Sequence, residues 1–378
     1  MSPHVCIVMP SYNHAAFVGE AIQSILDQSF QDFEINITDD GSQDGTPDVI
    51  RKFTDRRINL EVFPENRGGV IAGNSAIRRA SGKYIARLNS DDFFLPGKLE
   101  KQVAFLDANP EIAAVFSMPR LIDERGNPLA DGYREFTFPF SHPRPSRGEW
   151  LRHFFLYGNC LCFPTVMIRQ TIFDEVGLLD PRLAILPDFD MWVRLCMNHE
   201  IHVMESELTA FRKMDNNRNM SAPRTDTVVR VAFEVFQILK HYRGLNPEFA
   251  RKIFANDLAK WGIDANQRFE IWLSELALHS GSAGRSSARR LFALDTMFEA
   301  SAMAENECRR LIEWTGKIDV FNIIAARQLH ELQRQPDSAQ QNAGGVLNRS
   351  GQGAESRRNA MCHCGSGKRF KHCHGRLT

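Results

Sequence analysis

The sequence contains no apolar run approaching the roughly 18 residues that a membrane-spanning helix needs. It has no basic N-terminal stretch followed by an apolar core, so nothing in it resembles a secretion signal. Net charge is also missing, because 46 Lys and Arg balance 46 Asp and Glu, and no overall field attracts nucleic acid or an acidic membrane. We therefore expect a cytoplasmic protein, with peripheral attachment at the inner membrane face as an alternative.

Cysteine is scarce and falls into two groups. Most of the eight cysteines are scattered singly among apolar residues, which is typical of a reducing compartment. The others lie close together near the C-terminus, a spacing that favours metal binding over disulfides.

Strands and helices alternate through the first part of the chain. Apolar runs of β-forming residues predict strands at Val5–Met9, Phe33–Thr38, Asn59–Phe63, Tyr84–Leu88 and Ala113–Ser117. Helical spacing of apolar residues predicts helices at Ala15–Leu26, Pro47–Phe53, Gly69–Ala80 and Lys98–Ala108. This alternation predicts an α/β fold with a mostly parallel sheet, right-handed crossovers and flanking helices.

The pattern then changes. Residues Pro119–Arg152 are rich in Pro and Gly and predict an irregular excursion with a hairpin at Glu124–Asn127. A further strand is predicted at Cys162–Ile168 and a helix at Thr171–Val176. From about residue 225 to residue 335 the chain reads almost wholly as helix.

These changes predict four parts. Residues 1–222 would form the α/β domain and residues 223–335 an α-helical extension. Residues 336–360, which are rich in Gln, Ser, Gly, Asn and Arg, predict a flexible linker. Residues 361–378 would form a small metal-binding knuckle.

Polar residues cluster where predicted strands end. The four clusters are Pro10–Asn13, Asp39–Asp44, Asn89–Asp92 and Asp188–Asp190. Open α/β sheets bind their ligands at the carboxyl edge of the strands, so we expect these clusters to meet at one site. The fourth also opens an amphipathic helix.

The adjacent carboxylates of Asp91 and Asp92 repel each other unless a cation or hydrogen-bond donors hold them. Mg²⁺ or Mn²⁺ prefers oxygen ligands and leaves coordination positions to substrate phosphates. The alternative is a helix cap, in which Asp92 caps a helix that begins near Leu95.

Together, the order and spacing of these clusters resemble the family 2 glycosyltransferases of the GT-A fold, over roughly residues 3–222. The residues that carry the resemblance are Pro10–Asn13, Asp39–Thr46, Asn66–Gly69, Ala72–Asn74, Gly82–Asp92 and Asp188–Leu195.

The resemblance implies a role for each matching residue. The residues that it assigns to a nucleotide-sugar donor are Pro10, Tyr12, Asn13, Asp39, Asp40, Asn66, Asn89, Asp91 and Arg212. Asp91 and Asp92 match the carboxylates that hold Mg²⁺ or Mn²⁺, and Asp92 would be the more direct ligand. Asp188 matches the general base.

Three positions depart from the family pattern. Asn89 stands where many relatives have an Asp, so metal coordination rests on Asp91 and Asp92. Gly73 stands where an Ala-Arg-Asn triplet is usual, so a phosphate or base contact from that arginine has no counterpart at this position. Pro187 replaces the acidic or small residue common before the base.

Residues 211–221 resemble a mobile segment that closes over the donor diphosphate in this family. Arg212 and Lys213 would then contact phosphate. The alternative is a solvated basic surface loop.

The C-terminal stretch Cys362–Gly375 carries soft ligands in two close pairs around a glycine-bearing turn, which suits tetrahedral Zn²⁺. It resembles the SEC-C zinc motif, with Cys362, Cys364, Cys373 and His374 as the ligands. Such a knuckle is too small for its own core, so zinc would supply its folding energy. Its basic residues predict docking to an acidic partner, which could be a protein, a nucleic acid or a membrane surface.

The sequence thus predicts a metal-dependent inverting glycosyltransferase. It would transfer a sugar from a nucleotide donor, foremost a UDP-sugar, to an unidentified hydroxyl acceptor in cell-surface polysaccharide or glycoconjugate synthesis. The rival is a degenerate nucleotide-sugar-binding scaffold for the zinc tail, with Asn89 and Gly73 as its lesions. A Rossmann dehydrogenase is disfavoured because no Gly-x-Gly-x-x-Gly follows the first strand.

Overall fold

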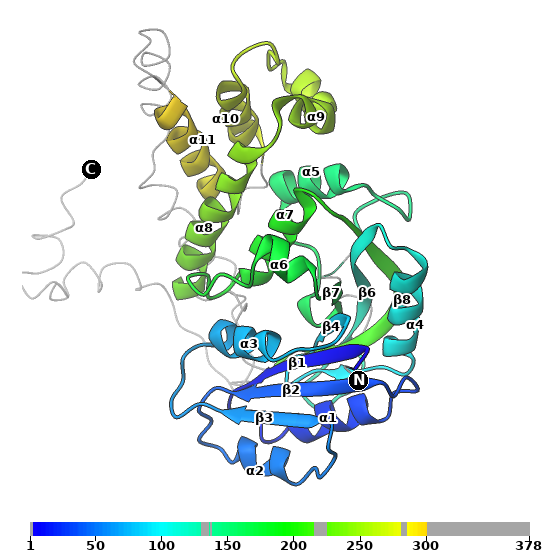
Figure 1. Cartoon of the computed structure of the whole chain (residues 1–378). Coiled ribbons are helices and arrows are strands. Elements are labelled where there is room, and N and C mark those ends of the chain that lie inside the picture. The colour runs from blue at the N-terminus through cyan, green and yellow to red at the C-terminus, as the bar shows by residue number, and fades with distance from the viewer. Residues whose placement is uncertain (1–2, 130–135, 137, 215–224, 281–285, 301–378) are drawn as a thin grey trace, which may run out of the picture. The chain divides into compact units, whose positions relative to one another are not determined.

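A computed structural model describes residues 3–129, 136, 138–214, 225–280 and 286–300. All of them fall within one compact unit, Met1–Gln328. The strands are β1 (Val5–Ser11), β2 (Phe33–Asp39), β3 (Ile58–Val62), β4 (Tyr84–Arg87), β5 (Phe93–Phe94), β6 (Ile112–Ile122), β7 (Met167–Arg169) and β8 (Glu200–Arg212). They form one sheet in the order β3-β2-β1-β4-β7-β6-β8-β5 (Figure 1).

Helices flank this sheet and extend beyond it. The α-helices are α1 (Val18–Leu26), α2 (Thr46–Arg51), α3 (Gly69–Arg78), α4 (Lys98–Ala108), α5 (Arg147–Tyr157), α6 (Ile172–Val176), α7 (Pro187–Cys196), α8 (Thr225–Leu239), α9 (Pro247–Trp261), α10 (Phe269–His279) and α11 (Ser286–Ala300). In the described part of the chain, the 3-10 turn η1 (Phe163–Thr165) lies between α5 and β7, and η3 (Lys240–Gly244) lies between α8 and α9. None of the described helices is both long enough and apolar enough to cross a membrane.

The N-terminal half of the sheet is parallel, as predicted. Strand β1 pairs in parallel with β2 and β4, and β2 pairs in parallel with β3. Along β1, Val5, Ile7 and Met9 pack in the core that contains α1 and α4, whereas Cys6 and Val8 pack toward α3. Helix α3 therefore covers one face of this half and α1 the other (Figure 1). Because all four strands run the same way, their carboxyl ends meet at one edge.

The other half of the sheet is mixed. Strand β7 is antiparallel to both β4 and β6, β8 is parallel to β6, and β5 is antiparallel to β8. The long strand β8 was not predicted, because its middle residues Glu205, Ser206 and Glu207 are exposed and interrupt the apolar alternation. Its last residue, Arg212, belongs to the strand and pairs with Ile122.

The segment predicted as irregular contains more order than expected. Strand β6 continues to Ile122, and the predicted hairpin turn is confirmed by the backbone bond from Asp123 N–H to Asn127 O, 2.8 Å. Helix α5 was overlooked, although Ser146 and Glu149 form a capping box at its start. The Ser-x-x-Glu spacing is the sequence signal that identifies such a start.

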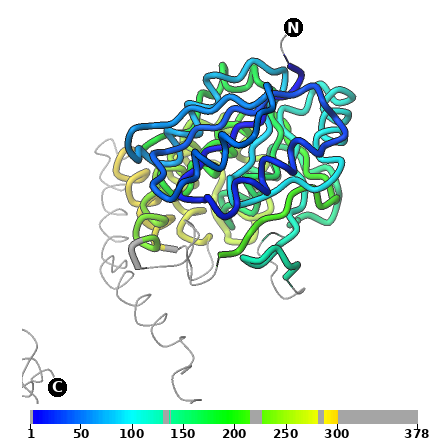
Figure 2. The backbone as a smooth tube through the Cα atoms, turned by 90° about the horizontal axis from the view of Figure 1, so that it is seen from below, coloured from blue at the N-terminus to red at the C-terminus, as the bar shows by residue number. Residues whose placement is uncertain are grey.

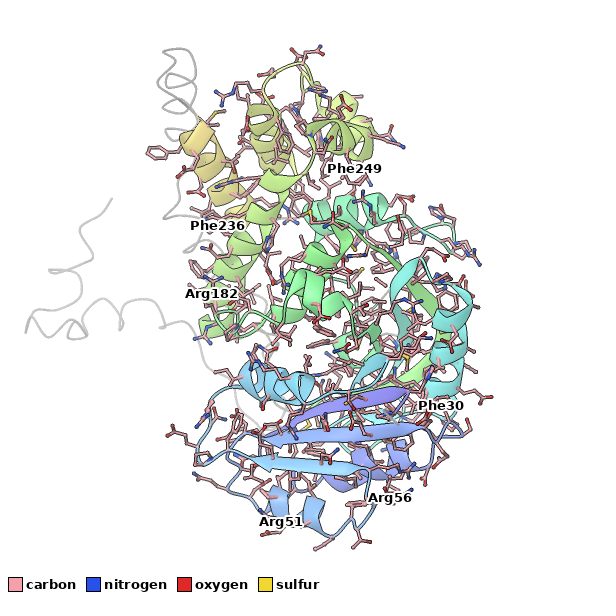
Figure 3. The ribbon with its side chains drawn as sticks, viewed as in Figure 1. Phe30, Arg51, Arg56, Arg182, Phe236 and Phe249 are labelled. Carbon is pink, nitrogen blue, oxygen red and sulfur yellow. The ribbon has the colours of Figure 1, made fainter. Side chains whose placement is uncertain are left out.

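The described part of the extension is helical, as predicted, and the chain also breaks between α9 and α10, which was not predicted. Helices α8 to α11 share one hydrophobic core with α5 and α7, in which Val235 and Leu239 pack with Phe154 and Trp192. Figure 3 shows side chains filling the space between α7 and α8. The predicted boundary at residue 222 therefore does not divide this core.

The two ends of the described chain lie apart. Figure 1 shows β1, β2 and β3, in blue, at the bottom and α9 and α11, in yellow-green and yellow, at the top. Figure 2, seen from below, shows the blue segments nearest the viewer. The segments between them, from β4 through α7, carry Asp91, Asp92 and Asp188.

Candidate active site

The loops after β1 and β2 are joined by hydrogen bonds. Asn13 has a left-handed backbone, with φ of 52°, and its Oδ1 accepts a bond from Gln43 N–H, 2.9 Å. Asn13 N–H donates to Ser42 Oγ, 2.8 Å, and Ser42 in turn donates to both carboxylate oxygens of Asp39. The predicted residues Asn13 and Asp39 therefore lie in one network.

Asp40 has a structural task. Its two carboxylate oxygens accept the backbone N–H of Arg67, 2.7 Å, and of Gly68, 2.9 Å, just before α3. Burial raises the pKa of this carboxyl, and the two N–H donors oppose that rise. The Asp40 side chain thus clamps the loop of Asn66, which is exposed, against the end of β2.

Two other residues near the end of β1, Pro10 and Tyr12, were also predicted to bind the donor. Pro10 lies within β1, paired with Thr38, whereas the Tyr12 side chain is 42% exposed. Further along, His14 Nδ1 lies 2.8 Å from Ser90 Oγ, which connects this loop to the loop after β4. The first three polar clusters are therefore neighbours, as predicted.

The acidic loop after β4 is tightly held. Asp92 is 1% exposed. Its Oδ1 accepts Arg212 N–H at 2.8 Å, and its Oδ2 accepts Asn89 Nδ2–H at 2.9 Å. Burial and the neighbouring Asp91 raise the pKa of Asp92. No described residue donates a hydrogen bond to the carboxylate of Asp91, which is partly exposed.

Asp92 does not cap a helix. Helix α4 begins at Lys98, its N-cap is Gly97, and no side chain caps it. The alternative explanation of the acidic pair is therefore wrong, because both oxygens of Asp92 are bound within the loop and to β8 instead.

Arg212 braces the acidic loop from the end of β8. Its side chain is 2% exposed, and its Nε–H donates to Asp91 O at 2.7 Å. Its two terminal nitrogens donate to Glu124 O at 2.9 Å and to Glu20 Oε2 at 2.6 Å. A phosphate contact from Arg212 stays a prediction, and it would have to replace one of these bonds.

Asp188 lies in the first turn of α7. The predicted helix is confirmed, but the fourth polar cluster follows a loop after α6 and does not end a strand. Its Oδ2 accepts a hydrogen bond from Asn159 Nδ2–H, 2.9 Å. Burial raises the pKa of Asp188 to about 6. A carboxylate with such a pKa is ionised at neutral pH and still basic enough to accept a proton.

The charge of Arg87 interacts with the carboxylates of both Asp92 and Asp188. Its guanidinium lies 4.6 Å from the ring centroid of Phe163 and feels the charges of both Asp188 and Asp92. Burial lowers the pKa of Arg87 to about 10, so the side chain remains a cation at neutral pH. Its Nη2–H reaches Asn89 Oδ1 at 3.4 Å.

Glu234 of α8 holds the backbone that precedes Asp188. It is 2% exposed, and its carboxylate accepts the N–H groups of Ala184, Ile185 and Leu186, with the bond to Leu186 at 2.7 Å. The other acidic residue of this turn, Asp190, binds Arg194 at 2.7 Å and His241 at 2.8 Å. The helical extension therefore sets the position of the α7 N-terminus.

We did not predict Arg87, Asn159 or Glu234 as site residues. Arg87 carried a usable signal, because a charged residue between Ala86 and Leu88 in a buried strand needs a reason. Asn159 and Glu234 carried none, because each acts on a segment far away in the sequence.

No group of three or more His, Cys, Asp or Glu side chains in the described part of the chain is arranged to hold a metal by itself. The pair Asp91 and Asp92 nevertheless supplies the hard oxygen ligands that Mg²⁺ or Mn²⁺ prefers. Such a cation usually takes one or two carboxylates and completes its shell with phosphate and water. The zinc ligands predicted at Cys362, Cys364, Cys373 and His374 lie outside the described residues, as do residues 215–221 of the predicted closing segment.

Comparison with known proteins finds similarity to two families. Residues 6–176 match the model of glycosyl transferase family 2, and residues 358–376 match the SEC-C motif. An uncharacterized glycosyltransferase of Methanocaldococcus jannaschii is 27% identical over 266 residues, which cover 69% of this chain and 85% of the relative. The Bacillus subtilis glycosyltransferase TuaG is 39% identical over 129 residues, 34% of this chain and 51% of that protein.

Solved structures share the fold. S. aureus TarS in complex with UDP-GlcNAc aligns with a TM-score of 0.51 and 16% identity, over 80% of this chain and 91% of that chain. The mannosyltransferase PcManGT from Pyrobaculum calidifontis, in complex with GDP-Man and Mn²⁺, aligns with a TM-score of 0.50 and 17% identity, over 88% of each chain. The predicted GT-A architecture is therefore confirmed.

Proposed function

We propose that this chain, which carries a family 2 glycosyltransferase domain at residues 6–176, is a metal-dependent inverting enzyme that transfers a sugar from a nucleotide donor to a hydroxyl acceptor. The observation that carries the proposal is the pairing of two kinds of carboxylate. Asp91 offers a carboxylate to a cation, whereas Asp188 has a pKa of about 6 and lies on another element.

The chemistry uses these groups in one displacement. The acceptor oxygen attacks the anomeric carbon from the face opposite the donor phosphate, and its proton passes to Asp188. The bond between the anomeric carbon and the phosphate oxygen breaks, and its electron pair stays on the leaving nucleoside diphosphate. Attack from the opposite face inverts the configuration at the anomeric carbon.

Asp91 and Asp92 would hold Mg²⁺ or Mn²⁺ at the diphosphate. A bound divalent cation stabilises the charge that develops on the leaving phosphate. Because Asn89 and Arg212 already bind the oxygens of Asp92, these two residues would keep that carboxylate oriented toward the cation. Asp91 would contribute the oxygens that no described residue occupies.

The proposal also names the nucleobase of the sugar donor and the class of product. A UDP-sugar stays our first choice, although the two solved structures named above contain a uridine donor and a guanosine donor. TuaG is named for teichuronic acid biosynthesis, which supports a cell-surface polymer or glycoconjugate as the product. The acceptor would bind beside Asn159 and Asp188.

A panel of nucleotide sugars tests this function. We expect release of nucleoside diphosphate with one class of donor, only in the presence of Mg²⁺ or Mn²⁺. The rival function, a nucleotide-sugar-binding scaffold, predicts binding of the same donor without any turnover in the presence of cell-wall or glycan acceptors.

A further inference from the structure

Arg87 is a buried cation with unsatisfied donors. Its side chain is 7% exposed, and neither Nε nor Nη1 has a hydrogen-bond partner among the described residues. Among the described residues its side chain makes one hydrogen bond, from Nη2–H to Asn89 Oδ1, which is long at 3.4 Å. A buried N–H without an acceptor destabilises the fold, and more so when the group is charged. Such a group needs an explanation, and a bound anionic ligand is one that would satisfy it.

Gly73 of α3 provides the room for this side chain. A Cβ atom at position 73 would lie 2.7 Å from Arg87 Nη1, which is closer than the two atoms tolerate. Any larger residue there would therefore push the guanidinium out of its place. Gly73, which departs from the family pattern, therefore makes room for the side chain of Arg87.

Two carboxylates lie near Arg87, but neither accepts a hydrogen bond from its Nε or Nη1. Asp92 lies near, but Asn89 and Arg212 bind its two oxygens. Asp188 lies near as well, but its Oδ2 accepts a hydrogen bond from Asn159 Nδ2–H. Phe163 lies against the guanidinium, and its buried Nε–H and Nη1–H groups meet no acceptor among the described residues.

We propose that Arg87 of β4, whose guanidinium occupies the space beside Gly73, binds the diphosphate of the nucleotide-sugar donor. This inference rests on the proposed function and names one binding contact within it. A guanidinium matches phosphate because its planar fork donates two parallel N–H bonds. As the bond from the anomeric carbon to the phosphate oxygen breaks, the electron pair adds charge to that oxygen, and Arg87 would stabilise it alongside the cation.

Binding measurements separate this contact from general loss of structure. The affinities of UDP and GDP, with Mn²⁺ present, are compared with those of uridine and guanosine by calorimetry. Arg87→Met should weaken binding of the preferred nucleoside diphosphate by roughly 10- to 100-fold, the scale of a lost charge-assisted hydrogen bond, and leave the nucleoside unaffected. Gly73→Ala should weaken the same ligand, because it displaces the guanidinium without removing its charge.

Thermal stability gives a second readout that does not depend on activity. Since Arg87 is an unsatisfied buried cation, Arg87→Met should raise the melting temperature of the ligand-free protein while it weakens diphosphate binding. Arg79→Ala is the control. Arg79 lies at the C-terminal end of α3 and, like Arg87, has a buried Nε without a partner among the described residues, but its Nη2 donates to Ile37 O and Thr38 Oγ1 in β2. The control should bind diphosphate as the wild type does.

The outcomes are distinct. If Arg87→Met and Gly73→Ala bind the nucleoside diphosphate as tightly as the wild type, the inference is wrong and the proposed function stands. If the wild-type protein binds no nucleoside diphosphate with Mn²⁺, both fail. If Arg79→Ala weakens the ligand as much as Arg87→Met, the effect is general and the specific contact is excluded.

Discussion

The carboxylate of Glu234 accepts a hydrogen bond from the backbone N–H of Leu186, two residues before Asp188. Glu234 belongs to α8, which lies outside residues 6–176 of the matched family domain. A residue of the helical extension therefore fixes the turn that presents the proposed base.

Removing the Glu234 charge should disturb catalysis more than donor binding. In Glu234→Gln an amide nitrogen would meet the backbone N–H groups of 184–186, so we expect a loss of about 1–3 kcal/mol in stability and a fall in kcat of tenfold or more. The KM for the donor should change little. Steady-state kinetics well below the melting temperature measures both parameters.

Asp257→Asn is the control for that prediction. Asp257 is also a buried carboxylate of the extension, but it pairs with Arg152 of α5 and does not touch the α7 turn. It should lower stability without lowering kcat. An equal loss of kcat in both variants would mean that Glu234 affects catalysis only through the stability of the fold.

Replacing Asp188 by Asn keeps the shape of the side chain and its bond to Asn159, but removes the proton acceptor. We expect the rate to fall by about 10²- to 10⁴-fold, with donor affinity nearly unchanged. Single-turnover measurements at saturating donor test this. A loss confined to donor affinity would instead place Asp188 in the nucleotide pocket.

The pKa of Asp188 also predicts a pH dependence. Its value of about 6 means that the base is protonated in acid, so log kcat should fall with a slope of one below about pH 6. Because the pKa in the folded protein exceeds the unfolded value, ionisation of Asp188 lowers stability as the pH rises from about 4 to about 6. Asp188→Asn should therefore raise the melting temperature at pH 7 but not at pH 4.

Loss of the cation should abolish turnover. Asp92→Ala should eliminate activity and weaken metal-dependent nucleotide binding, because the pair Asp91 and Asp92 is expected to hold the cation that bridges the donor phosphates. Dialysis against a chelator followed by readdition of Mn²⁺ gives the matching test on the wild type. Full activity of Asp92→Ala in chelator-treated buffer would refute the metal assignment.

The C-terminal motif should be separable from catalysis. Truncation after Gln335 should leave donor turnover intact and remove one bound zinc per chain, which elemental analysis measures. Binding of the basic tail to an acidic partner should weaken with added salt. Absence of zinc in the full-length protein, or loss of donor turnover on truncation, would each contradict this prediction.

Local sequence patterns determined the parallel half of the fold and most of the site. Alternating strand and helix periods suffice to order β1, β2, β3 and β4, and the polar loops after three of these strands meet because parallel strands share a carboxyl edge. Helix α7, which carries the proposed base, was likewise evident from its acidic start and amphipathic period. The SEC-C match at residues 358–376 also follows from spacing alone.

Only the tertiary structure decided the rest. Strand β8 forms because it pairs along β6, with register shifts at Met118 that break the simple alternation. The contacts of Arg87 with Gly73, of Asn159 with Asp188, and of Glu234 with the α7 turn join segments distant in the chain. Periodicity and caps report on neighbours within a turn or a strand, whereas these contacts depend on where whole elements pack, and no local pattern encodes that.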